Sequence, residues 1–113
     1  MIEYTQAERR QAVAIGLNAE AWRRALGVSN MALAREIGAH PQACRNAEFG
    51  NYSFRTTEPV LRRMAAALGV PWLVFIERDP SNPEVAEILT AAAVHVALWR
   101  MKSAASTSNK EVA

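Results

Sequence analysis

The stretch LGVSNMALAREIGAHPQACRNAEFG, residues 26–50, contains two short helical patterns in immediate succession. The first pattern opens at Ser29, a good N-cap because its hydroxyl can accept a hydrogen bond from a backbone N–H of the first turn. Val28 before this cap and Leu33 inside the pattern are spaced to form a hydrophobic staple. These signals predict a helix over residues 30–37.

A turn of three or four residues leads into the second pattern. Gly38 ends the first helix, and Pro41 suits the first position of a new helix because its missing N–H would be unpaired there. The second helix is expected over residues 41–49, with Gly50 directly after it. Two short helices joined in this way form a helix-turn-helix.

The small and apolar residues that this arrangement needs are also present. Ala34 lies in the middle of the first helix, where the second helix must cross it closely. Cys44 and Ala47 supply apolar side chains for the inner face of the second helix. We interpret Cys44 as a small buried hydrophobe rather than a redox sensor.

Helical patterns also precede the stretch. Thr5 and Glu8 form a capping box that predicts a short helix up to Gly16, an N-terminal helical extension over residues 1–16. Asn18 is then expected to cap a separate helix.

Three more helices are predicted after the stretch. Thr57 is expected to cap a helix that Gly69 ends, and PWLVFI, residues 71–76, is expected to form a short helix that closes the core. A long final helix lies within residues 80–102. The small, polar tail SAASTSNKEVA, residues 103–113, has nothing to bury and is expected to be disordered.

Composition and charge favour one helical domain with a basic middle. The chain has 113 residues, half of them hydrophobic, which is enough for one core. Glycine and proline are scarce and period-2 alternation is missing, so we expect an all-α protein. Between residues 22 and 63 seven arginines face three glutamates, a net charge of +4, although the whole chain carries only +2. Such a local excess is typical of a surface that faces a polyanion, a solvated arginine-rich face being the alternative.

Several classes of protein do not fit this sequence. The N-terminus lacks the pattern of a secretory signal, and the longest apolar runs are far shorter than the ~20 residues that span a bilayer. We therefore expect a cytoplasmic protein without a membrane partner. The single cysteine and two isolated histidines offer no metal-ligand cluster, and neither a glycine-rich phosphate loop nor a nucleophile motif is present. No enzyme activity, metal, cofactor or small-molecule ligand is expected.

Residues 26–50 resemble the core signature of the lambda-repressor and Cro type of helix-turn-helix regulators. VLRRMAAALGVPWLVFI, residues 60–76, is similar to the two helices that follow this signature in the family. The likeness covers roughly residues 17–76. It implies a five-helix, lambda-repressor-like DNA-binding domain over residues 17–79, with double-stranded DNA as its partner.

By this resemblance the helix over residues 41–49 is the recognition helix that enters the major groove. Gln42, Arg45 and Asn46 would then face the base edges. Arginine can bond guanine O6 and N7 bidentately, and glutamine or asparagine can do the same with adenine N6 and N7. A merely solvated helix face is the alternative.

The resemblance also implies residues near the DNA backbone: Asn30, His40, Tyr52, Ser53 and Arg55. Contacts to phosphates set the register of a protein on DNA without reading its sequence. Capping is the alternative role for Asn30, and capping or filling the turn is the alternative for His40. Arg23 and Glu48 match a structural ion pair of the family, so Arg23 is not counted as a phosphate contact.

Apolar residues of the final helix recur at alternating spacings of four and three: Val85, Leu89, Ala92, Val96 and Trp99. Family members of this size commonly bind two-fold operators as dimers, so this seam is predicted to be a homodimer interface. The alternative is packing against the chain's own core. The sequence as a whole predicts a dimeric transcriptional repressor that occludes a palindromic operator. A helical protein–protein adaptor or antitoxin-like module is the alternative function.

Overall fold

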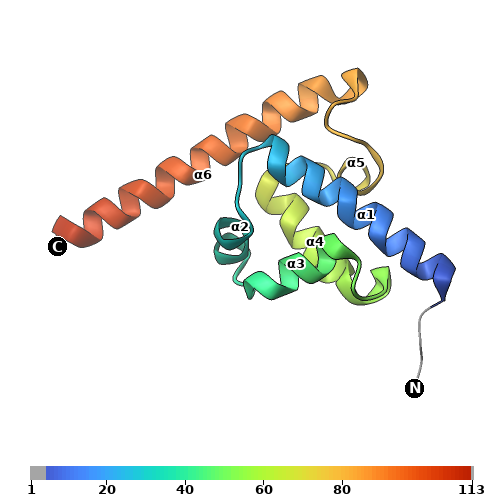
Figure 1. Cartoon of the computed structure of the whole chain (residues 1–113). Helices are drawn as coiled ribbons and strands as arrows, with labels where there is room; N and C mark the ends of the chain where they lie inside the picture. Colours follow the sequence, from blue (N-terminus) through green and yellow to red (C-terminus); the bar gives the residue numbers. More distant parts are fainter. Residues whose placement is uncertain (1–4, 113) are drawn as a thin grey trace.

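A computed structural model describes residues 5–112 and the side chains of residues 5–104. This part of the chain folds into helices and connecting turns without a strand, which confirms the all-α prediction. The elements are α1 (Gln6–Ala25), α2 (Asn30–Ile37), α3 (Pro41–Phe49), α4 (Phe54–Leu68), α5 (Trp72–Glu77), a short 3₁₀ helix η1 (Pro83–Val85) and α6 (Ala86–Val112) (Figure 1). The first five helices pack around one core, and α6 runs across it and extends beyond it (Figure 1).

Helix α1 is continuous, which corrects the predicted helix end at Gly16; residues 1–4 of the predicted extension over residues 1–16 lie outside the described residues. The capping box of Thr5 is present, but the helix continues through Gly16 to Ala25. A Cβ at Gly16 would lie 2.6 Å from the Ala47 carbonyl oxygen, so the glycine permits close crossing of α1 over α3 and does not end a helix. Asn18 does not cap a helix, because its amide donates to the backbone carbonyls of residues 75 and 78 at 2.8 and 2.7 Å.

Helices α2 and α3 have the bounds that their capping signals predict. The Ser29 hydroxyl accepts from the Ala32 N–H at 3.0 Å, and Pro41 is the first residue of α3. Gly38 ends α2 with a φ of 67°, a left-handed conformation that glycine adopts without steric cost. The local signals therefore determine this pair of helices.

Helix α4 begins one turn earlier than predicted. Ser53, not Thr57, is its N-cap, with the Ser53 hydroxyl accepting from the Thr56 N–H. The Thr57 hydroxyl lies inside the first turn and donates to the Ser53 carbonyl at 3.3 Å. Serine and threonine can both cap a helix. Here Ser53 is the cap, and Thr57 is a buried residue inside α4.

The core is formed where the first five helices meet. Its largest fully buried side chains include Trp22, Leu33, Met64 and Phe75. The Trp22 indole N–H donates to the Arg78 carbonyl at 2.7 Å, so its one polar atom is satisfied as the ring is buried.

The predicted dimer seam packs against the chain's own core, which corrects the predicted interface. Val85, Ala92 and Val96 are at most 4 % exposed, and Leu89 and Trp99 are half-buried against the core. The Trp99 indole N–H donates to the Ala67 carbonyl of α4 at 3.1 Å. A stripe of this spacing fits a neighbouring helix equally well in the same chain or in a second copy, and here its own α4 covers it.

The prediction of a disordered tail over residues 103–113 is wrong for residues 103–112, which continue α6 as helix. This segment contains neither glycine nor proline, so it can extend a helix that is already nucleated. Residue 113 lies outside the described residues.

Candidate functional site

A buried ion pair fixes α3 against α1. The Arg23 Nε donates to Glu48 Oε2 at 2.6 Å, and Arg23 Nη2 donates to Glu48 Oε1 at 3.0 Å. Arg23 Nη1 donates to the Val28 carbonyl at 2.8 Å, so the guanidinium also holds the turn that leads into α2. Both side chains are buried, and the pair that the resemblance implies is therefore present. It sets the orientation of α3 relative to α1 and α2.

Asn30 lies beside this pair and faces inward. Its Nδ2 lies 3.4 Å from Glu48 Oε1, and its Oδ1 is buried without a hydrogen-bond partner among the described residues. The capping role considered for Asn30 is filled by Ser29. Asn30, the first residue of α2, thus contacts the ion pair, and its Nδ2 is the group that could donate to a phosphate.

The outer row of α3 carries the three residues predicted to read bases. Gln42 is exposed, and Arg45 and Asn46 are half-exposed. Gln42 Nε2 donates to Asn46 Oδ1 at 3.0 Å, and the Asn51 amide donates to the same oxygen at 3.0 Å. The side-chain amides of Gln42 and Asn51 therefore share one acceptor, Asn46 Oδ1. Arg45 makes no hydrogen bond or ion pair within the described residues, which leaves its guanidinium fork free.

Asn51 is a member of this cluster that the sequence did not single out. It follows Gly50, whose left-handed conformation turns the chain back over the end of α3. Asparagine is common in such turns, so its residue type alone carried no functional signal.

The inner face of α3 is apolar apart from Glu48. Cys44 and Ala47 are buried there, and Cys44 is fully covered. Burial raises the pKa of the Cys44 thiol, and the charge of Glu48 raises it further, while Arg23 and Arg63 oppose the rise. The thiol is therefore protonated at neutral pH and packs as a hydrophobe.

The predicted backbone-contact residues have different environments. His40 is the N-cap of α3, with its Nδ1 accepting from the Gln42 N–H at 3.0 Å, so the capping alternative is observed. The Ser53 hydroxyl is engaged in capping α4. Tyr52 and Arg55 are exposed and have no hydrogen-bond or ion-pair partner in the described part of the chain. Both belong to the segment that follows α3.

Ion pairs neutralise only some of the arginines in the basic middle. Arg24 pairs with Glu20 at 2.7 Å, and Arg62 lies 3.7 Å from Glu58 and 4.3 Å from the centre of the Trp72 ring. Within residues 22–63 the arginines without an ion pair among the described residues are Arg35, Arg45, Arg55 and Arg63. The basic excess therefore includes α3 and the segment after it.

Neither a metal site nor a membrane-spanning helix is present in the described residues. No group of three or more histidine, cysteine, aspartate or glutamate side chains is arranged to hold a metal ion within residues 5–104. In the same range, none of the helices combines the length and apolarity needed to cross a bilayer. Comparisons of the chain with protein-family models, curated proteins and solved structures find no match.

Proposed function

We propose that this protein is a sequence-specific, DNA-binding transcriptional regulator of the lambda-repressor type, with α2 and α3 as its helix-turn-helix. The observation that carries this proposal is the outer row of α3. Gln42, Arg45 and Asn46 lie on the open side of a helix whose opposite side is fixed by the Arg23–Glu48 ion pair. A rigid helix with a free polar row is suited to reading base edges.

The chemistry of the row fits the major groove. The unpaired Arg45 guanidinium can donate two hydrogen bonds to guanine O6 and N7. Asn46 Oδ1 already accepts from two amides, so its Nδ2 remains to donate, and Gln42 keeps its Oε1 as an acceptor. This polarity favours adenine or guanine acceptors opposite Asn46.

The segment after α3 supplies contacts to phosphates in this proposal. Tyr52 and Arg55 would bind the DNA backbone through side chains that have no partner in the described residues. His40 would add a contact through Nε2, because its Nδ1 is engaged in capping α3. These contacts orient the protein without reading sequence.

A dimer on a palindromic operator needs a face other than the predicted seam. Val94, Leu98 and Met101 of α6 are 55, 60 and 67 % exposed and are spaced by four and three residues. This outer row of α6 has heptad spacing, and we propose that a second copy covers it. Two copies would place their recognition helices in successive major grooves and occlude the promoter, as a non-enzymatic repressor in the cytoplasm.

The test is selection from a random duplex DNA library. The native protein is compared with a Gln42→Ala, Arg45→Ala, Asn46→Ala triple variant whose helicity and thermal unfolding match the native protein. We expect the native protein to enrich an inverted repeat and the variant to enrich none. Absence of enrichment by the native protein would reject the proposal and favour the alternative, an adaptor that binds another protein through the outer row of α6.

A further inference from the structure

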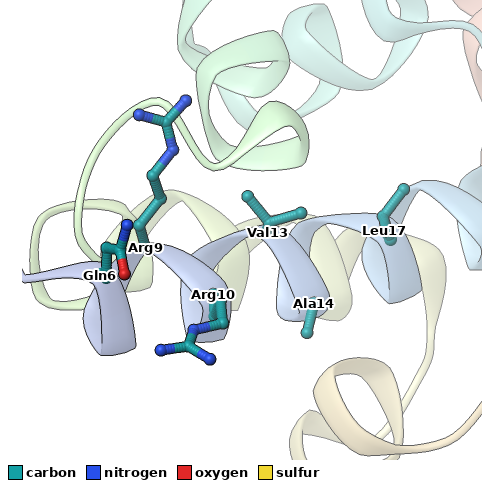
Figure 2. A pocket seen from close by; sticks show the side chains of 6 residues that line it. All are labelled: Gln6, Arg9, Arg10, Val13, Ala14 and Leu17. Atoms are coloured by element: carbon teal, nitrogen blue, oxygen red, sulfur yellow. The ribbon is translucent and has the colours of Figure 1, made fainter.

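A shallow hollow of about 530 Å³ runs along the N-terminal half of α1. Two arginines and small or apolar side chains line it: Gln6, Arg9, Arg10, Val13, Ala14 and Leu17 (Figure 2). No acidic residue lines this hollow among the described residues. The nearby Glu8 carboxylate accepts from the Thr5 N–H in the capping box. The hollow is therefore a cationic surface with apolar walls.

The two arginines of this surface point to opposite sides of α1 (Figure 2). Arg9 points to the side on which α3 and the turn after it lie, whereas Arg10 points away from them (Figure 2). Both side chains are exposed and neither has an ion pair in the described part of the chain. The chain thus offers a matched pair of free guanidinium groups that differ mainly in direction.

Direct packing connects the side of α1 that carries Arg9 to the outer row of α3. Gly50 lies so close to α1 that a Cβ there would be 2.7 Å from the Val13 backbone nitrogen. The next residue, Asn51, donates to Asn46 of the outer row. Arg9 precedes Val13 by one helical turn and so lies on the same side of α1. Contacts around the buried Gly50 therefore link the outer row of α3 to the side of α1 that carries Arg9.

We propose that the N-terminal half of α1 binds the DNA backbone, with Arg9 donating to a phosphate beyond those reached by Tyr52 and Arg55. This inference rests on the proposed function, because α3 must first face the DNA. A free guanidinium binds a phosphate bidentately, and the exposed Leu17 offers an apolar surface to the sugar edge. The continuous α1 lengthens the binding surface without adding any base-specific contact.

The test measures affinity against salt for the duplex enriched by the native protein and for a shuffled duplex of equal length. The proteins are the native chain, Arg9→Ala, Arg9→Lys and the matched control Arg10→Ala, each shown to melt like the native protein. The slope of log K against log salt is negative, and a lost phosphate contact reduces its magnitude by about 0.9. We expect this loss for Arg9→Ala on both duplexes, a native slope for Arg10→Ala and a largely restored slope for Arg9→Lys.

Single methylphosphonate substitutions in the enriched duplex then locate the contact. One position is expected to weaken the native protein several-fold while leaving Arg9→Ala unchanged, and it must differ from the position coupled to Arg55. Equal slopes for Arg9→Ala and Arg10→Ala, or the absence of such a phosphate position, would overturn the proposed role of Arg9. Either result would leave the proposed DNA-binding function of α3 intact. If the native protein enriches no duplex in the selection, the proposed function is overturned as well.

Discussion

The two faces of α3 carry polar side chains in opposite environments. On the inner face Glu48 is 2 % exposed, and its carboxylate is bound by Arg23 and lies within reach of the Asn30 amide. On the outer face Gln42 is exposed and Arg45 is half-exposed, and the hydrogen bonds along this row join side-chain amides. The nine-residue helix α3 therefore has a different role on each face. Its inner residues stabilise the fold, and its outer residues remain available for a ligand.

The largest effect is expected on the inner face. Glu48→Ala leaves the Arg23 guanidinium buried without its counter-ion, and removing one partner of a buried pair costs about 3–5 kcal/mol. Urea unfolding should therefore show a loss of that size in the free energy of unfolding. Glu36→Ala, at an exposed carboxylate without an ion pair in the described residues, is the matched control and should change stability by less than about 0.5 kcal/mol. Equal losses for both variants would remove the distinction between the two faces.

The crossing of α1 over α3 gives a second test of the inner face. Gly16→Ala introduces a Cβ within 2.6 Å of the Ala47 carbonyl oxygen, and overpacking of this kind costs about 1–3 kcal/mol. The expected result in thermal unfolding is a lower midpoint. Alanine has a higher helix propensity than glycine by about 1 kcal/mol. If no atom of α3 lay close to Gly16, the same substitution would therefore stabilise the protein. A raised midpoint would contradict the close crossing.

The outer face should show the reverse behaviour. Arg45→Ala should leave the free energy of unfolding within about 0.5 kcal/mol of the native value. It should cost about 1–3 kcal/mol in binding to the enriched duplex and relax the preference at one base position. Arg55→Ala should instead weaken binding to enriched and shuffled duplexes alike. Anisotropy titrations on both duplexes separate these results, and identical specificity profiles for the two variants would refute the assignment.

The smallest expected effect concerns the buried thiol on the inner face. Burial raises the pKa of Cys44 above its ordinary value near 9.0, so the folded state holds this proton more tightly than the unfolded state. The resulting contribution to stability is complete below the unfolded pKa and is lost as the pH rises through the folded pKa. Native protein should therefore lose more stability than Cys44→Ala between neutral and alkaline pH. Parallel pH curves for the two proteins would show that the thiol does not titrate differently on folding.

The sequence predicted the features that depend on local backbone chemistry and missed those that depend on tertiary contacts. Helices α2 and α3 were predictable because Ser29, Gly38 and Pro41 act through local backbone chemistry. Gly16 was misread as a helix end, since glycine serves both helix ends and close helix crossings and only tertiary contacts distinguish them. The seam containing Val96 was assigned to a second copy for a similar reason, because an apolar stripe does not encode which chain covers it.

The candidate site was predictable only in part. Gln42, Arg45 and Asn46 could be assigned to an open helix face from their spacing. The link from Asn51 to Asn46 depends on how the chain turns at Gly50, which no pattern in the sequence specified. The position of Arg9 near the turn after α3 could not be predicted, because it depends on the continuity of α1 and on its packing against Gly50.

The most direct test of the account is to observe which face of the molecule contacts DNA. Isotope-labelled protein is titrated with the enriched duplex, and the NMR signals of the backbone and of the side-chain amides are followed. If the outer row of α3 binds DNA, the largest shifts are expected at Gln42, Asn46 and Asn51, together with the guanidinium signal of Arg45. Shifts confined to the outer row of α6, with the outer row of α3 unchanged, would contradict it.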